Sequence, residues 1–317
     1  MKCTIQNIAD HLGLSRNTVS KALKNSSEVS ENTRNLVIKT ASKLGYKNAT
    51  FATPVIPASE TGSNGTILFL TRTYASDSEF WTTVLRGIES ILSNANYHLA
   101  ISIMSDSDLK QLNFPQTISD SSIKGIILVE ICDKVVCDAL SQFNLPIVSV
   151  DMPNVPFEEL NGIDVVTMES KKNLKKIINQ LIEKGAESFG FVGDLYSPNV
   201  SRGFQERYNA LSECLAEHQL PLNQKNCLLH QTPEDFRNFQ TTVNNLQAMI
   251  SLPDVFICGN DWTAIQLIYA LQFLGFQIPK DICVVGFDNI PAASRISPSL
   301  TTISTPQKYL GLSLIHI

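Results

Sequence analysis

The chain has 317 residues, of which 43% are hydrophobic and 17% charged, and its net charge is −5 at pH 7. This length favours two or three folding units over a single core. The sequence has no long apolar run and its first residues are polar throughout, so it predicts neither a membrane-spanning helix nor a secretory signal.

The charge is unevenly distributed along the chain. Residues 1–48 carry eight basic and three acidic side chains, a net charge of +5, which leaves −10 for the remainder. A small basic head on an acidic body favours a polyanionic partner for the head alone, although a basic solvated surface would give the same balance.

Residues 4–46 predict three short helices, with Gly13 after the first, Gly45 after the third, and Ser15 and Ser30 as caps of the second and third. Apolar side chains recur at helical spacing, so each helix has one inward face. The inward residues are Ile5, Ile8, Ala9 and Leu12, then Val19, Ala22 and Leu23, then Leu36, Val37, Ala41 and Leu44. A helix, a short turn with glycine and a second helix form the layout of a DNA-binding helix-turn-helix.

Residues 49–65 are rich in Pro, Gly, Ser and Thr and predict a linker. From residue 66 onward, apolar strands alternate with amphipathic helices, which is typical of parallel sheets covered on both faces. The stretch is longer than one sheet usually needs, so we predict two α/β lobes. The expected strands are TILFLT, HLAISIM, GIILVEI, PIVSVD, SFGFVGD, DVFICG and ICVVGFD, and the expected helices lie near 80–95, 170–184, 202–219, 234–251 and 262–274.

The seven cysteines form no C-x-x-C pair, and most lie in apolar stretches such as VFICG and DICVVGF. Such cysteines are typical of small buried side chains in a reducing cytosol. The five histidines show no ligand spacing. We therefore expect a cytoplasmic protein without disulfides, bound metal or cofactor.

Open parallel sheets bind ligands beyond the carboxyl ends of their strands. Polar residues directly after predicted strands are therefore the places where a site is expected. They are Asp77, Asp106, Asp151, Asp194, Asn260 and Asp288.

The sequence resembles the LacI/GalR family of bacterial transcription regulators over nearly its whole length. In the head, the elements T-x-x-x-I-A, G-x-S-x-x-T-V-S-x-x-L and V-S-x-x-T-R stand at the spacing of that family. In the body, FWTTVLRGIE, PIVSVD, FVGD, GNDWTAIQLIYAL and IPKDICVVGFDNIPAAS follow in the family's order. Several motifs in sequence make a chance match improbable.

The resemblance implies an α/β fold with a small helix-turn-helix head and two Rossmann-like lobes of the periplasmic-binding-protein type. It also implies a homodimeric repressor that binds a near-palindromic double-stranded operator, with affinity controlled by a sugar or sugar phosphate in the cleft. The expected domains are a head at 1–48, a hinge at 49–65, an N-lobe at about 66–162 and 295–311, and a C-lobe at about 163–294.

In this layout the second helix enters the major groove. Arg16, Asn17 and Lys21 point away from its apolar stripe and are expected to contact base edges, Arg and Lys at guanine and Asn at adenine. A solvated helix face is the alternative for each. Residues expected at phosphates are Thr4, Ser15, Thr18, Ser20, Asn25 and Thr33.

The sequence departs from the family at the hinge. YKNATFATPVIP lacks the Pro-Asn-x-x-Ala-x-x-Leu pattern with which family members form a hinge helix, and Pro54 and Pro57 would interrupt one. Phe51 or Val55 could replace the leucine that wedges into the minor groove.

The resemblance and the chemistry of polyol binding indicate the effector site. Arg207 is preferred to Arg202 by its spacing to the downstream helix, and a surface ion pair is the alternative for both. A helix N-cap is the alternative for Asn260, and for Asp261 it is the preferred role. Core packing is the alternative for one of Phe80 and Trp81. A turn is the alternative for Asp151, and a place on the lobe surface is the alternative for Trp262. The expected effector-binding residues are Phe80, Trp81, Asp151, Arg207, Asn260, Trp262 and Asp288, with Asp77, Ser78 and Asp106 as weaker candidates.

No nucleotide-binding, nucleophile-elbow or zinc-protease motif occurs, which argues against catalysis. A sugar-processing α/β enzyme, or a sugar-binding protein with an accessory head, remains the alternative function. The final residues LSLIHI suggest a strand and match the translation of a transposon-end adaptor used in sequencing libraries. We therefore expect Leu312–Ile317 to be a non-native tail.

Overall fold

The computed structural model divides by its contacts into two units, Met1–Gly62 and Ser63–Ile317, each with its own core. None of the described helices is long and apolar enough to cross a membrane. The residues that the structure describes are 4–23, 29–30, 33–34, 36–37, 40–41, 63–72, 78–195, 201–230 and 238–314.

The head contains helices α1 (Ile5–Leu12) and α2 (Arg16–Leu23), and residues 33–34, 36–37, 40 and 41 are also helical. Gly13 ends α1 in the left-handed conformation, with φ of 63°, which a glycine adopts without strain. The side chain of Ser15 begins α2 by accepting a hydrogen bond from Thr18 N at 3.0 Å. Both predictions for this turn are confirmed.

The core of the head follows most of the predicted inward faces. Ile8, Val19 and Val37 are fully buried. The prediction for Leu36 is wrong, because its side chain is 51% exposed and Val37 takes the inward position of that turn. Leu44, Gly45 and the hinge residues Phe51, Pro54, Val55 and Pro57 lie outside the described residues.

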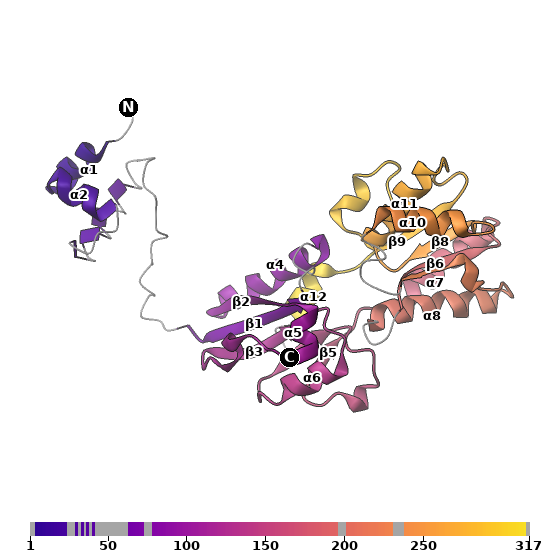
Figure 1. Cartoon of the computed structure of the whole chain (residues 1–317), viewed down its shortest axis with the longest axis horizontal. Helices are drawn as coiled ribbons and strands as arrows, with labels where there is room; N and C mark the ends of the chain where they lie inside the picture. The colour runs from indigo at the N-terminus through magenta and orange to yellow at the C-terminus, as the bar shows by residue number, and fades with distance from the viewer. Residues whose placement is uncertain are drawn as a thin grey trace. The chain divides into compact units, whose positions relative to one another are not determined.

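The N-lobe is built on a five-stranded parallel sheet with the order β2-β1-β3-β4-β5 (Figure 1). Helices α4 (Glu79–Asn94), α5 (Asp106–Gln111) and α6 (Lys134–Ser141) connect its strands. The strands are β1 (Gly65–Arg72), β2 (Tyr97–Met104), β3 (Ile123–Leu128), β4 (Ile147–Val150) and β5 (Asp164–Val166).

The C-lobe is a second five-stranded parallel sheet with the order β10-β9-β8-β6-β7. Its strands are β6 (Phe189–Asp194), β7 (Leu228–His230), β8 (Val255–Cys258), β9 (Cys283–Asp288) and β10 (Thr301–Ser304). Its helices are α7 (Lys172–Glu183), α8 (Arg202–Glu217), α10 (Phe239–Ala248) and α11 (Asp261–Phe273).

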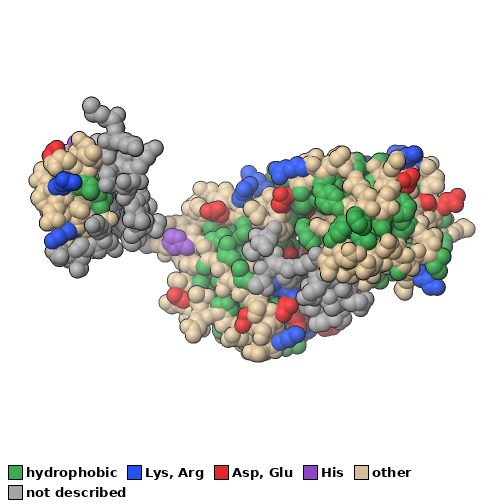
Figure 2. Space-filling view, turned by 45° about the horizontal axis from the view of Figure 1, so that its top comes forward, with side chains coloured by type: hydrophobic (Ala, Val, Ile, Leu, Met, Phe, Trp, Pro, Cys, Tyr) green, Lys and Arg blue, Asp and Glu red, His purple; other side chains and the backbone are tan. Residues whose placement is uncertain are grey.

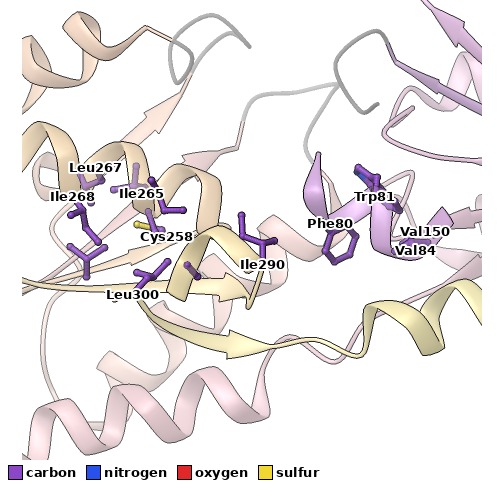
Figure 3. Close-up of a cluster of buried hydrophobic side chains, with 14 of the residues drawn as sticks. Phe80, Trp81, Val84, Val150, Cys258, Ile265, Leu267, Ile268, Ile290 and Leu300 are labelled. Carbon is purple, nitrogen blue, oxygen red and sulfur yellow. The ribbon is translucent and has the colours of Figure 1, made fainter. Parts of the chain in front are cut away.

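Both sheets are covered on both faces, as their buried strands require. On one face of the C-lobe sheet, α7 and α8 pack around Phe189 and Phe191. On the opposite faces, α4 of the N-lobe and α11 of the C-lobe contribute to one apolar cluster that extends through both lobes. Figure 3 shows this cluster, with Phe80 and Trp81 at the beginning of α4 and Ile290 between them and the C-lobe side chains.

The last described helix, α12 (Gln307–Ser313), packs against α4 of the N-lobe (Figure 1). Two glycines permit this close approach. A Cβ added at Gly87 would lie 2.6 Å from the carbonyl oxygen of Lys308, and one at Gly311 would lie 3.1 Å from the Cα of Gly87. The chain therefore returns to the N-lobe after it has formed the C-lobe.

The structure differs from the sequence predictions at short elements and at the lobe boundaries. All seven expected strands are present, but β5, β7, β10, α5 and α6 were not predicted. β5 joins the N-lobe sheet beyond the expected boundary at 162, and β10 joins the C-lobe sheet within 295–311, which we had assigned to the N-lobe. Each pairs with a neighbouring strand of its sheet, and this long-range contact overrides the local pattern.

The strand predicted at Leu312–Ile317 is wrong where the structure describes it. Leu312 and Ser313 continue α12, and Leu314, at its C-cap, is only 2% exposed. Packing of this helix against α4 decides the conformation, whereas the local sequence favours a strand. Residues 315–317 lie outside the described part.

Candidate functional site

A pocket lies where the carboxyl ends of the two sheets meet. Its empty volume is about 500 Å³, including the part open to solvent. Its lining residues lie at or after the ends of the first, third and fourth strands of each sheet, next to the point where strand order reverses, with Met168 added after the fifth strand of the N-lobe. They are Ser78, Phe80, Trp81, Glu130, Val150, Asp151, Met152, Met168, Ser201, Phe204, Arg207, Asn260 and Asp288.

Arg207 is the only basic side chain among these lining residues, and it is 3% exposed. It lies on α8, where Nη1 donates to the carbonyl oxygen of Gly259 at 2.6 Å. Its guanidinium stacks on the Phe287 ring at 3.8 Å from the ring centroid. Burial lowers the pKa of Arg207, and the carboxyl groups of Asp288 and Asp151 act in the opposite direction.

Asp288 ends β9 with φ of 114°, a backbone conformation that side chains rarely adopt. Its carbonyl oxygen accepts a hydrogen bond from Gln307 Nε2 at 2.6 Å, which holds the turn. Burial raises the pKa of its carboxyl group to about 7, although Arg207 lowers it. The Oδ1 atom is buried and has no hydrogen-bond partner among the described residues.

Asp151 follows β4 and also has a positive φ, of 53°. Its Oδ1 accepts a hydrogen bond from Met168 N at 3.0 Å, and its carbonyl oxygen accepts one from Arg202 N at 2.9 Å. Burial raises the pKa of Asp151 to about 6, opposed first by Arg207. Gly203 allows its approach to α8, because a Cβ there would lie 2.9 Å from Asp151 Oδ2.

The aromatic wall of the pocket comes from the first turn of α4. Phe80 and Trp81 are 7% and 6% exposed, and their rings meet edge to face at 4.8 Å. Trp81 Nε1 donates to Glu130 Oε1 at 2.6 Å, which fixes a carboxylate from the end of β3 against the indole. Both aromatic residues therefore pack in the core and line the pocket.

Asn260 lines the pocket and caps α11, because its Oδ1 accepts a hydrogen bond from Thr263 N at 2.9 Å. The cap role that we preferred for Asp261 is wrong. Asp261 is fully buried, and its carboxylate accepts hydrogen bonds from Ile290 N at 2.8 Å and from the Thr302 hydroxyl. Burial raises the pKa of Asp261 to about 6. It supports the loop after β9 that carries Asp288.

The structure brings together Phe80, Trp81, Asp151, Arg207, Asn260 and Asp288, together with the weaker candidate Ser78. It does not place Trp262 in the lining, because the α11 helix turns this side chain outward, where it is 41% exposed. Asp106 pairs with Arg72, and Asp194 also lies outside the lining. Asp77 lies outside the described residues.

Arg202, the alternative to Arg207, is absent from the pocket lining. Its Nη2 donates to the carbonyl oxygens of Val155 and Pro153, and its guanidinium stacks on Phe157. It therefore joins the two lobes beside the pocket.

The pocket lining also contains six residues that were not predicted from the sequence, namely Glu130, Val150, Met152, Met168, Ser201 and Phe204. Glu130 lies within the predicted strand GIILVEI, whereas the observed strand β3 ends at Leu128, so the overlong strand prediction hid a residue that follows the strand end. Ser201 caps α8 by accepting a hydrogen bond from Phe204 N at 3.2 Å. Met168 is brought in only by the unpredicted strand β5.

On the head, the predicted base-reading residues lie on one helix. Arg16 and Asn17 are exposed in the first turn of α2, and Lys21 lies half-buried one turn later. The predicted phosphate-binding hydroxyls lie at helix beginnings, where backbone N–H groups attract anions. Thr4 caps α1, Ser15 caps α2 with its hydroxyl 2.8 Å from that of Thr18, and Thr33 N donates to Ser30 Oγ at 3.3 Å. Ser20 is half-buried in α2, and Asn25 lies outside the described residues.

A helix-turn-helix head followed by two parallel α/β lobes with a pocket between them defines a ligand-responsive DNA-binding protein of the periplasmic-binding-protein type. Family comparison agrees for both parts. Residues 4–48 match the bacterial regulatory proteins of the lacI family, and residues 178–316 match the periplasmic binding protein-like domain.

Curated relatives align over almost the whole chain. Catabolite control protein A of Staphylococcus xylosus is 27% identical, covering 98% of this chain and 90% of the relative. The ribose operon repressor of Haemophilus influenzae is 27% identical, covering 97% and 88%. The transcriptional repressor PurR of Photobacterium profundum is 26% identical, covering 99% and 90%.

Solved structures share the fold at lower identity. A complex of the transcriptional regulator CelR with cellobiose has a TM-score of 0.67 at 18% identity, covering 99% of this chain and 91% of that chain. The lac repressor dimer bound to operator and an anti-inducer has a TM-score of 0.65 at 20% identity, covering 100% and 91%.

The chain belongs to the LacI/GalR family of bacterial transcription regulators. It is a DNA-binding regulator of the repressor type.

Proposed function

We propose that this regulator binds a small polyhydroxylated effector, a sugar, in the pocket between its lobes, and that the effector changes its affinity for operator DNA. The pocket carries this proposal, since it joins Arg207, Asp151, Asp288 and Asn260 with an aromatic wall. Carboxylates and amides satisfy sugar hydroxyls, and aromatic faces cover the apolar side of a ring.

Similar proteins support a sugar as the effector. They include a ribose operon repressor, a CelR–cellobiose complex and a LacI-family regulator of Lactobacillus casei with bound sucrose. The last structure has a TM-score of 0.63 to this chain at 20% identity, covering 80% of this chain and 90% of that one.

On the DNA side, we infer that α2 lies in the major groove and that Arg16, Asn17 and Lys21 contact base edges. Thr4, Ser15, Thr18, Ser20, Asn25 and Thr33 are assigned to phosphates. Replacing Lys21 by Ala should relax base preference at one operator position, whereas Thr33→Ala should weaken binding to all sequences alike. Binding measured across an operator library distinguishes the two; a uniform loss in Lys21→Ala would contradict its assignment.

A second copy of the chain completes the proposed regulator. Helix α11 presents Trp262, Tyr269 and Phe273 along one exposed stripe, with Phe239 of α10 against Phe273 at 5.8 Å. Figure 2 shows hydrophobic side chains gathered on the C-lobe surface. Such an apolar surface marks an interaction site, and the lac repressor is named as a dimer on its operator. A monomer in analytical ultracentrifugation at micromolar concentration would contradict this assignment.

Control follows from linkage. If the effector changes the affinity of the protein for the operator by some factor, the operator must change the affinity for the effector by the same factor. The test is a mobility shift with operator DNA, with and without the sugar that gives the largest thermal shift. A body that binds sugar while the head ignores DNA would contradict the proposal. Turnover of the sugar would favour the alternative, a sugar-processing enzyme, although the relatives are transcriptional regulators.

A further inference from the structure

The described pocket lining carries an excess of negative charge. Three carboxyl groups, from Glu130, Asp151 and Asp288, face one guanidinium, from Arg207, so the balance is −2 when all four are ionised. Asp261 lies directly behind this lining and raises the pKa of Asp288 further by its charge. The electrostatic environment of a ligand here is therefore acidic.

Arg207, the one cation among the described lining residues, already interacts with other groups of the protein. The guanidinium of Arg207 donates to Gly259 O at 2.6 Å and stacks on Phe287, and its charge interacts with both Asp288 and Asp151. An arginine that receives a phosphate presents a free fork of donors to it. Arg207 retains part of its donor capacity for a hydroxyl group, but its charge is balanced within the protein.

Three helices begin at this pocket, and helix beginnings attract anions. Each of these beginnings carries a cap: the side chains of Ser78, Ser201 and Asn260 accept hydrogen bonds from the first turns of α4, α8 and α11. The effect of a helix dipole is about 0.3–1 kcal/mol for an anion, whereas an ionised carboxylate carries a full charge at the same place, even though the raised pKa values of Asp151 and Asp288 leave these two groups partly protonated near pH 7. The carboxylates therefore dominate.

Glu130 differs from the other two carboxyl groups in its surroundings. It lies two residues after the end of β3 with φ of 55°, and Trp81 Nε1 donates to its Oε1 at 2.6 Å, beside the edge-to-face pair of Phe80 and Trp81. A fixed carboxylate next to aromatic rings is a setting that favours a cation. Across the pocket, Asp288 Oδ1 is buried without a hydrogen-bond partner among the described residues. This oxygen is therefore available to accept a hydrogen bond from a donor group of the ligand.

We propose that the pocket discriminates among polyhydroxylated ligands by charge, favouring those with a protonated amine and excluding those with a phosphate, and that Glu130 sets this preference. The inference rests on the proposed sugar effector and narrows it, since sugar phosphates are removed from the candidates. Glu130 acts here as a specificity-determining residue.

The test uses the full chain and matched derivatives of glucose, galactose and mannose: the free sugar, the 2-amino sugar, its N-acetyl form and the 6-phosphate. Calorimetric affinities should rank the amino sugar at least about tenfold above its N-acetyl form and the phosphate at least about tenfold below the free sugar, for each scaffold that binds. A phosphate that binds as tightly as its parent sugar overturns the inference.

Glu130→Gln tests the role of this residue. The amide keeps an oxygen for the indole of Trp81 but loses the charge, so the ratio of amino-sugar affinity to free-sugar affinity should fall at least about fivefold. Glu89→Gln, which removes an exposed carboxylate on α4, should leave the ranking unchanged. An unchanged ranking in Glu130→Gln refutes its assignment.

The two proposals fail in different ways. If no derivative of any scaffold binds, the proposed sugar effector is contradicted, and the charge preference with it. If sugars bind but phosphates bind best, the effector proposal stands and only the charge inference is overturned. Thermal unfolding of each variant at the same pH confirms that a lost affinity is not a lost fold.

Discussion

The two lobes repeat one topology with different side chains. The N-lobe sheet has the order β2-β1-β3-β4-β5, and the C-lobe sheet read in the same sense is β7-β6-β8-β9-β10. Counted within each lobe, both orders are second, first, third, fourth, fifth. The pocket therefore receives residues from the first, third and fourth strand ends of each lobe, and Met168 after the fifth strand of the N-lobe in addition.

At the fourth strand the two lobes agree, because Asp151 and Asp288 both follow it with positive φ. At the third strand they differ, with Glu130 in one lobe and Asn260 in the other. After the first strand, the N-lobe supplies an aromatic wall, whereas the C-lobe supplies Arg207. The repeated topology thus determines the positions of the pocket residues. The side chains at these positions differ, so each lobe provides different binding groups.

The largest expected effect comes from removing Arg207, the one cation among the lining residues that the structure describes. Arg207→Ala should weaken effector binding more than about 100-fold, or about 3 kcal/mol, because it leaves buried carboxyl groups unpaired. Operator binding by the effector-free protein should remain. Calorimetry and mobility shift measure the two effects.

Arg202→Ala is the matched control for Arg207→Ala, because Arg202 precedes it on the same helix but lies outside the pocket lining. Its effect on effector affinity should stay within about tenfold. If instead Arg202→Ala abolishes effector binding and Arg207→Ala does not, the site has been assigned to the wrong arginine.

The pH dependence of stability should show the buried carboxyl groups. Burial raises the pKa of Asp288 to about 7 and that of Asp151 to about 6, above the ordinary value of 3.8, so the folded protein binds more protons than the unfolded chain in this range. The stabilisation that these protonated groups contribute to the free energy of unfolding is fully present below their pKa in the unfolded chain. It is lost as the pH rises through their pKa values in the folded protein. Urea unfolding should therefore show a loss of about 3 kcal/mol between pH 5 and pH 8.

The pH dependence of stability also distinguishes the carboxyl group at the end of the fourth C-lobe strand from the one that follows the fourth N-lobe strand. Asp288→Asn should remove more of the slope than Asp151→Asn, because the pKa of Asp288 is raised further. Asp261 has a raised pKa as well and should account for the slope that remains. Stability that increases from pH 5 to pH 8 would contradict the burial of these groups in ionisable form.

A smaller effect is expected at the strand position two residues before each aspartate, which is Gly286 in the C-lobe and Ser149 in the N-lobe. A Cβ at 286 would collide with Asp261 Oδ1 and lie 2.7 Å from Leu300 Cδ2. Gly286→Ala should therefore lower the free energy of unfolding by about 2 kcal/mol. Gly125→Ala, whose added Cβ would lie 3.3 Å from the carbonyl oxygen of Pro146, should cost less than half as much in the same urea titration.

The smallest effect is expected at Ser149, whose fully buried hydroxyl has no hydrogen-bond partner among the described residues. Ser149→Ala removes this unsatisfied group and should raise the free energy of unfolding by about 1 kcal/mol. A lower melting temperature in scanning calorimetry would show that the hydroxyl has a stabilising partner.

The sequence predicted those parts of the fold whose pattern is local. β1, β3 and β8 are continuous apolar runs, and α4 begins at a serine cap, so periodicity and capping were enough. β5 and β7 have only three residues each, and no periodicity can be read from three residues. They are strands because a neighbouring strand offers them a ladder of hydrogen bonds.

Strand ends were a good guide to the candidate site, since Asp151, Asn260 and Asp288 all line the pocket. Trp262 shows the limit of this reasoning, because its direction depends on the rotation of α11 about its axis. Asp261 shows another limit. Its neighbour Asn260 accepts the cap hydrogen bond, and the sequence does not reveal that Ile290 and Thr302 lie within reach of the next carboxylate.

The packing of α12 on α4 has a consequence for biosynthesis. Gly87 is made early and Gly311 late, yet their backbones must meet for the apolar face of α4 to be covered. While a ribosome synthesises the C-lobe, that face of the N-lobe lacks its cover, and contacts between such distant segments form slowly. The nascent N-lobe therefore exposes this apolar face until Gly311 has been synthesised.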